Sequence, residues 1–320
     1  MQYVRLAAAV AELRSLGRQA MNAEVSRSGK ISPIIFLIII SIVRPFVPDS
    51  LVWGLAIAQL VVLIRAIPRR DWTTIHLAIL LWSLTLFSVI PGTRRWPWVF
   101  LVPVLLYWAL VQSFRPLRLT VGWLRMGHAT LPMWIAAATV AMGSAVSLLL
   151  WFKLACPDVK SLAGLIPIWS PARLVLLGVG FALFNAAWEE MIWRGVVFDA
   201  LERTRLPTGT VVLMQAVSFG VIHLHGFPSG SVGILLASAY GAVLGVLRAQ
   251  TGGLLVPFVT HAVTDFSHLR DIALPCTRLM LPTEYCLTKR CSRRLPGALP
   301  CFHMTKTLQL AATLAPTSGG

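Results

Sequence analysis

The sequence predicts an all-α fold, a polytopic bundle of about eight transmembrane helices. Hydrophobic residues make up 57% of the 320 residues and charged residues only 12%, and the mean hydropathy is +0.75. In soluble domains about 25% of residues are charged. The apolar residues also form continuous runs, unlike the alternating segments of roughly ten residues in a membrane β-barrel. We therefore expect a multi-pass integral membrane protein.

The candidate spans are apolar runs separated by polar, basic or proline-containing connectors. They cover residues 33–43, 51–63, 74–90, 96–111, 130–152, 174–201, 211–223, 231–247 and 254–266. Several runs are shorter than the roughly 20 residues that a full crossing needs. The first two could be re-entrant, tilted or one broken hairpin, which is why we expect about eight crossings.

The segments outside these spans have a different composition. Residues 1–32 are basic and carry one apolar helical face, so we expect an amphipathic helix on the membrane surface or a disordered segment. Residues 33–152 would form the N-terminal transmembrane helices. Residues 275–320 lack hydrophobic periodicity and combine Cys, Pro and basic residues, which predicts a disordered or atypical tail.

The net charge of +16 indicates contact with membrane lipids. The Lys and Arg residues fall mostly in short connectors and in the two termini, the positions at which basic side chains contact anionic head groups. Nucleic acid is therefore not expected as a partner. The five cysteines include no CxxC pair, so they predict no metal site.

Three formal charges interrupt the run 174–201. Glu189, Glu190 and Arg194 lie where ionisable groups cost about 2.5 to 3.5 kcal/mol each, so they persist mainly where they pair or line a polar cavity. On a helix, Glu190 and Arg194 are four residues apart and can form an ion pair. Glu189 points about 100° away from Glu190 and has no local cation. The sequence thus predicts one paired carboxylate and one free for chemistry.

Two later spans carry the same four-residue spacing. Phe219 precedes His223 by one turn, so its ring can pack against the imidazole, and His261 precedes Asp265, whose carboxylate can orient the ring. Side chains from facing helices build sites in bundle cores, so we expect these groups to converge with Glu189. Taken singly, each has a structural interpretation, as a helix-to-helix hydrogen bond or a helix cap.

The order of these motifs resembles the CPBP family of intramembrane metalloproteases, which includes CAAX prenyl endopeptidases and bacteriocin-processing or Abi-like self-immunity proteins. The family signature is two adjacent glutamates with an arginine four residues after the second, then Phe and His four apart, then His with Asn or Asp four later. The matching stretches are Glu189-Glu190-Met191-Ile192-Trp193-Arg194, Phe219-Gly220-Val221-Ile222-His223 and His261-Ala262-Val263-Thr264-Asp265. The resemblance makes residues 171–267 a catalytic helix core.

The resemblance implies an intramembrane endopeptidase. Glu189 and His223 would hold and deprotonate a water molecule, while His261 and Asp265 would stabilise the tetrahedral intermediate. Three further residues would support the site: Glu190, Arg194 and Phe219. Asp265 stands where the family commonly has Asn, and an ionised Asp can only accept hydrogen bonds.

The cofactor and the substrate stay open at this point. A divalent metal such as Zn²⁺ could be held by Glu189, His223 and His261 with a position left for water, yet the motifs lack the HExxH arrangement, and a metal-free mechanism competes. The family acts on prenylated CAAX peptides, leader peptides or membrane-protein segments, so we expect a membrane-associated peptide substrate. A bacterial cell membrane is favoured over a eukaryotic endomembrane as its location.

Two other classes of function use the same residues. The polar cluster could bind a peptide or hold the bundle together in a non-catalytic self-immunity protein. Intramembrane Glu, His and Asp also serve transporters and proton relays. A transporter would more often show internal repeats with interrupted helices in corresponding positions, and the sequence has no convincing repeat.

Overall fold

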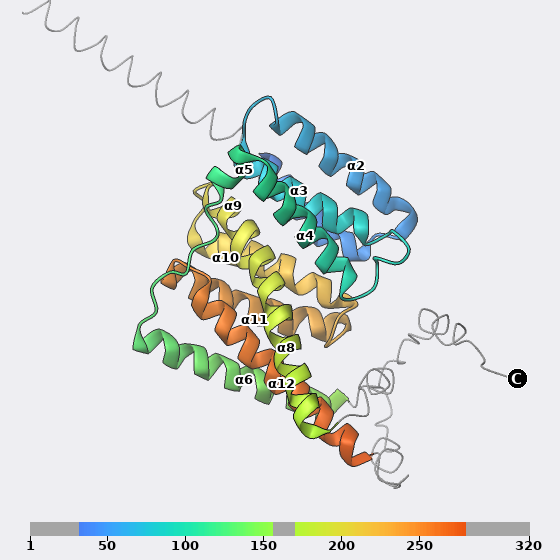
Figure 1. The fold of residues 1–320 in the computed structure, drawn as a ribbon, viewed down its shortest axis with the longest axis vertical. Helices are drawn as coiled ribbons and strands as arrows, with labels where there is room; N and C mark the ends of the chain where they lie inside the picture. Colours follow the sequence, from blue (N-terminus) through green and yellow to red (C-terminus); the bar gives the residue numbers. More distant parts are fainter. Residues whose placement is uncertain (1–31, 156–169, 280–320) are drawn as a thin grey trace, which may run out of the picture.

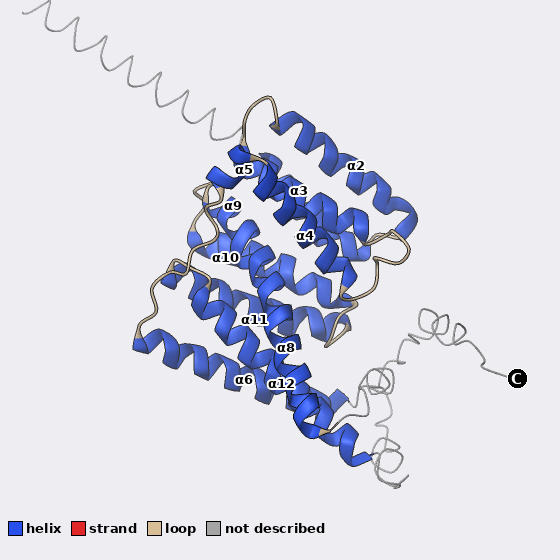
Figure 2. Cartoon of the chain, viewed as in Figure 1, coloured by secondary structure: helices blue, strands red, loops and turns tan. Residues whose placement is uncertain are grey.

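The computed structural model describes residues 32–155 and 170–279, and within this part of the chain the fold is all helical, with no strand (Figure 2). The segment 1–32, except its last residue, and the tail 275–320, except the end of the last helix, lie outside the described residues. That last helix ends at Leu279, past residue 275, where the tail was predicted to begin.

Within the described residues, four helices are long and apolar enough to cross a membrane, which confirms the all-α membrane fold. They are Asp49–Ala66, Leu131–Trp151, Ala172–Glu202 and Gly230–Thr251. Shorter apolar helices cover Ser32–Phe46, Trp72–Phe87, Trp98–Ser113 and Thr208–Leu224. Each predicted apolar run coincides with a helix, while the number of crossings stays a prediction.

The N-terminal half forms one group of antiparallel helices. It comprises η1 (Arg44–Phe46), α2 (Asp49–Ala66), α3 (Trp72–Phe87), α4 (Trp98–Ser113) and α5 (Arg115–Thr120). Helix α3 packs between α2 and α4 (Figure 1). Asp71 caps α3 by accepting hydrogen bonds from the amide and the hydroxyl of Thr74. Large apolar side chains on α2, such as Trp53 and Ile57, are exposed, as expected of a helix that faces lipid.

The C-terminal half forms the second group. It comprises α6 (Leu131–Ala155), α8 (Pro171–Glu189), the π-helix η2 (Glu190–Val197), α9 (Phe198–Glu202), α10 (Thr208–Gly220), η3 (Val221–Leu224), α11 (Gly230–Thr251) and α12 (Leu255–Leu279). Helix α12 packs against both α8 and α6, and α10 packs against α11 (Figure 1). The long helix α8, continued by η2 and α9, thus faces α12 along much of its length.

Glycines let α10 and α11 approach closely. A Cβ atom on Gly241 would lie 2.9 Å from the Phe219 ring, and one on Gly245 would lie 2.7 Å from Oε1 of Gln215. Small residues at this spacing allow helix backbones to pack tightly inside a membrane. The close packing brings Phe219 under α11.

The turn into α12 is held from outside. Helix α11 ends at Gly252, whose φ of +66° is the left-handed conformation that glycine adopts at helix ends. The segment between α5 and α6 then clamps the turn, because His128 N–H donates to the Thr251 carbonyl at 2.8 Å and Leu254 N–H donates to the Arg125 carbonyl at 2.7 Å. These bonds fix where α12 begins, and hence where His261 lies.

Candidate active site

The imidazole of His261 lies between carboxylates from two helices. Its Nδ1 is 2.7 Å from Oε1 of Glu190, while its Nε2 is 3.5 Å from Oε2 of Glu189 and 3.6 Å from Oδ1 of Asp265. His261 and both glutamates are buried. The structure therefore brings together three of the four predicted catalytic residues, Glu189, His261 and Asp265.

The predicted ion pair between Glu190 and Arg194 is present, and Glu190 makes a further contact with His261. Arg194 Nη1 donates to Oε1 of Glu190 at 2.9 Å, with both side chains buried, which confirms the pair. Glu190 also meets His261, and so does Glu189. The contact of Glu189 with His261 agrees with the predicted convergence, whereas the contact of Glu190 with His261 was not predicted.

The π-helix η2, which begins at Glu190, accompanies this difference. The predicted directions of the side chains hold for an α-helix with 3.6 residues per turn. A π turn is wider and changes the register of the side chains around the helix axis. Short π-helical segments inside α-helices occur frequently at functional sites. Here the change of register lies between the two glutamates and the helix that follows them, and both carboxylates reach one imidazole.

A buried arginine from α11 donates a hydrogen bond to a carbonyl of the π-helix. In an α-helix the amide of Phe198 would bond the Arg194 carbonyl, but here it bonds the carbonyls of Trp193 and Gly195. Arg248 Nε donates to the Arg194 carbonyl at 3.0 Å, and its guanidinium lies 5.3 Å from the centre of the Phe198 ring. Arg248 is 1% exposed. The side chain therefore stabilises the π turn from the neighbouring helix.

We expect Arg248→Met to lower the free energy of unfolding by about 1–3 kcal/mol, because it removes a buried, charge-assisted hydrogen bond to the Arg194 carbonyl. Unfolding by denaturant in detergent measures this loss. Arg115→Met, which removes an exposed arginine on α5, is the matched control and should change stability by less than about 0.5 kcal/mol. Equal effects of the two substitutions would contradict the role assigned to Arg248.

Asn185 is a member of the cluster that the sequence analysis missed. Its Nδ2 lies 3.3 Å from Oε1 of Glu189 and 3.0 Å from Oδ2 of Asp265. The available signal was its position four residues before Glu189, on the same face of an apolar helix. Tyr240 was also missed, and its ring packs edge-on against His261 with the centroids 5.5 Å apart.

The ring of Phe219 contacts the rings of both histidines. Its ring centroid is 5.1 Å from that of His223 and 6.1 Å from that of His261, and the Arg194 guanidinium lies 4.5 Å above the same ring. His223 Nδ1 is 3.4 Å from the Phe219 carbonyl. Among the described residues no hydrogen bond or ion pair joins His223 to Glu189, so the structure places this histidine beside the cluster.

The arrangement does not fit the suggested metal ligands. Both ring nitrogens of His261 face carboxylates, and His223 faces a backbone carbonyl. Within the described part of the chain, no group of three or more His, Cys, Asp or Glu side chains is arranged to hold a metal ion. A site made of Glu189, His223 and His261 would need different side-chain positions, and the metal stays a prediction.

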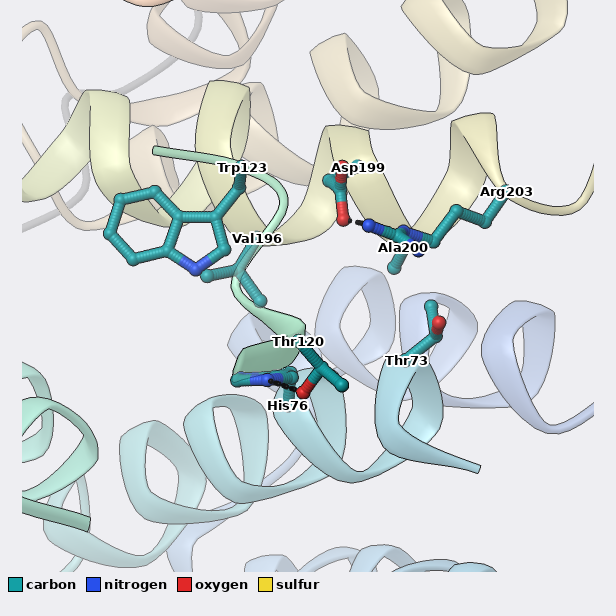
Figure 3. Close-up of a pocket in the computed structure, with 8 residues that line it drawn as sticks. All are labelled: Thr73, His76, Thr120, Trp123, Val196, Asp199, Ala200 and Arg203. Atoms are coloured by element: carbon teal, nitrogen blue, oxygen red, sulfur yellow. Dashed lines mark hydrogen bonds and ion pairs between the residues drawn. The ribbon is translucent and has the colours of Figure 1, made fainter. Parts of the chain in front are cut away.

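A second polar cluster surrounds a small pocket that is lined by residues of α3, α9 and the π-helix, among others (Figure 3). Its walls carry paired groups: Asp199 accepts from Arg203 at 2.8 Å, and Nε2 of His76 is 3.1 Å from the Thr120 hydroxyl. The other nitrogen of His76 bonds Tyr107, which also accepts from Trp123. The bonds of His76 and Tyr107 therefore link α3, α4 and α5 with Trp123, whereas the Asp199–Arg203 pair stays within one turn of α9.

The cluster around His261 lies in a part of the chain that matches a known protein family. Residues 171–267 match the family described as Type II CAAX prenyl endopeptidase Rce1-like. The chain carries an Rce1-like intramembrane protease domain. This confirms the predicted CPBP-type resemblance, and the matched range is the one predicted as the catalytic core. Comparisons with curated proteins and with solved structures gave no match.

The Rce1-like domain contains every residue of the carboxylate and histidine cluster, from Asn185 on α8 to Asp265 on α12. The domain and the apolar helices around it indicate an integral membrane protein with an intramembrane protease domain of the general CAAX endopeptidase type.

Proposed function

We propose that the Rce1-like domain hydrolyses peptide bonds of membrane-associated peptides with a water molecule that Glu189 activates. One observation carries this proposal: a buried imidazole, His261, meets three carboxylates that come from two different helices. Such a set costs free energy in an apolar bundle, so it is expected where chemistry requires it.

Glu189 is the group best placed to accept a proton. Its Oε1 receives the Asn185 amide, while its Oε2 lies 3.5 Å from His261, too far for a strong hydrogen bond. That oxygen can therefore accept a hydrogen bond from water and then its proton as the water attacks the peptide carbonyl, and the protonated Glu189 then gives this proton to the leaving amine nitrogen as the C–N bond breaks.

His261 would stabilise the tetrahedral intermediate. Its Nδ1 is held by Glu190, which fixes the orientation of the ring. When protonated at both nitrogens, the ring can direct its Nε2–H at the oxyanion, and the surrounding carboxylates stabilise the charge that the imidazolium carries. Asp265 adds to that stabilisation from the same helix.

His223 takes part after a movement. To hold the water together with Glu189, its ring must leave the place that it occupies against Phe219 and approach the cluster. His223 lies in the short 3-10 turn η3 that ends α10, a position at which a small backbone change redirects a side chain.

We propose prenylated CAAX-type peptides or membrane-bound leader peptides as substrates, and a bacterial cell membrane as the location. The test is cleavage by the purified chain in nanodiscs, with a prenylated CAAX peptide, the same peptide without its lipid, and a membrane-tethered leader peptide. We expect cleavage of at least one membrane-associated peptide and slower cleavage of the unlipidated one. If no peptide is cut although it binds, the alternative of a non-catalytic peptide-binding protein replaces this proposal.

The same assay tests whether cleavage requires a divalent metal. Each reaction is repeated with a chelator and then with added Zn²⁺. Cleavage that persists in chelator supports Glu189 and the histidines acting without a metal, as their contacts suggest. Cleavage that stops in chelator and returns with Zn²⁺ establishes a metal site and overturns the metal-free mechanism.

A further inference from the structure

The cluster around His261 has an excess of hydrogen-bond acceptors. Glu189, Glu190 and Asp265 supply three carboxylates, which only accept hydrogen bonds when ionised. Arg194 donates to Glu190, but no arginine or lysine contact reaches Glu189 or Asp265 within the described residues. A donor is needed where those two carboxylates approach each other.

Asn185 fills this position. A single nitrogen, Nδ2, is 3.3 Å from Glu189 and 3.0 Å from Asp265. Both partners are acceptors, so the NH₂ end of the amide must face them and can give one hydrogen to each. Asn185 and Glu189 are one turn apart on α8, whereas Asp265 is on α12, so the amide also ties the two helices together.

The two bonds have different consequences. The bond to Asp265 connects α8 with α12. The bond to Glu189 occupies Oε1 and so leaves Oε2, the oxygen nearest His261, for the water. Without the amide, two like charges would face each other with no donor between them, and the flexible Glu189 side chain would turn away.

We propose that Asn185 is a positioning residue of the active site, which fixes Glu189 for proton transfer and supplies the amide donor that the carboxylate at position 265 does not. This inference rests on the proposed function. It assigns Asn185 no contact with the substrate, because its amide hydrogens are directed at the two carboxylates.

The test compares kcat and KM of the full chain in nanodiscs for wild type and Asn185→Ala. We expect kcat to fall about 10- to 100-fold, since a displaced catalytic group costs a factor of this size. KM should stay within about twofold, because the substrate loses no contact. Gln59→Ala is the matched control: it removes a buried amide from α2, which packs against α3 away from the cluster, and should leave kcat unchanged.

A second pair of variants separates positioning from helix attachment. Asn185→Asp combined with Asp265→Asn exchanges donor and acceptor and restores the bond between α8 and α12, but it sets a carboxylate against Glu189. Its kcat is compared with that of Asp265→Asn alone, and thermal melting confirms that both fold. We expect the exchange variant to be at least about tenfold slower. If the two are equally active, Asn185 only joins the helices and the positioning role is excluded.

Comparing Asn185→Ala with Glu189→Gln distinguishes a failure of the positioning role from a failure of the proposed function. A chain in which Glu189→Gln is as active as wild type contradicts the catalytic assignment itself. A chain in which Glu189→Gln is inactive, while Asn185→Ala keeps kcat within about twofold, retains the proposed function and overturns only the role of Asn185.

Discussion

Replacing Glu189 with Gln should reduce peptide cleavage by about 10²- to 10⁴-fold, the contribution usually made by a general base. Gln has the same shape, and its carbonyl oxygen can still accept the Asn185 amide, but it cannot take a proton from water. Peptide binding should remain within about twofold of wild type, since the change removes only proton transfer. Single-turnover cleavage and direct peptide binding, measured on the same preparation, give the two numbers.

Glu202→Gln is the matched control for this substitution. Glu202 is exposed at the end of α9, and the pair that it forms among the described residues is with Arg125 at 3.5 Å, an interaction worth about 0–1 kcal/mol. We expect no change in cleavage. If Glu189→Gln cleaves as fast as the control, Glu189 does not act as a base. The alternative of a non-catalytic protein, whose polar cluster binds a peptide or holds the bundle together, then gains support.

Replacing Arg194 with Met should have the largest effect on stability, a loss of about 3–5 kcal/mol. The Arg194 side chain is fully buried, and its removal leaves the Glu190 carboxylate, 2% exposed, without its cation. Arg194 also donates to the Gly241 carbonyl at 3.3 Å and stacks on Phe219, so the packing of α11 against η2 would weaken as well. Unfolding in detergent at several denaturant concentrations measures the loss.

A double variant tests whether the unpaired charge is the cause. Adding Glu190→Gln to Arg194→Met removes the buried carboxylate while keeping an oxygen that can accept from His261. We expect the double variant to be more stable than Arg194→Met by about 1–3 kcal/mol, a coupling typical of residues in direct contact. If the losses of the two single substitutions add, the double variant is less stable than Arg194→Met and Glu190→Gln. That result would show that packing rather than charge dominates at this position.

The helices were predictable because lipid removes the alternatives. Backbone groups inside a bilayer must be satisfied within their own segment, so a continuous apolar run can only become a helix there. This is why each predicted run, from 33–43 to 254–266, coincides with a helix in the structure. The sequence patterns also located the candidate site, since charged residues inside such runs are rare enough to be informative on their own.

The contacts within the site were less predictable. Local spacing correctly paired Glu190 with Arg194 and brought Phe219 against His223, because both pairs are one turn apart on a single helix. Contacts between helices depend on how far each helix is rotated and translated relative to its neighbours, which no local pattern encodes. The approach of Asn185 to Asp265 across α8 and α12 is of this kind.

The sequence by itself determined the membrane class, the helices and the three motifs, because hydrophobic runs and one-turn spacing act within a single segment. Only the tertiary structure decided that both glutamates meet one histidine. That outcome accompanies a π-helix that begins at Glu190, and Arg248 of α11 donates to the Arg194 carbonyl within it. A π turn forms no more backbone hydrogen bonds than an α turn. Its position therefore depends on side chains from other helices, and it is seen only once those helices are packed together.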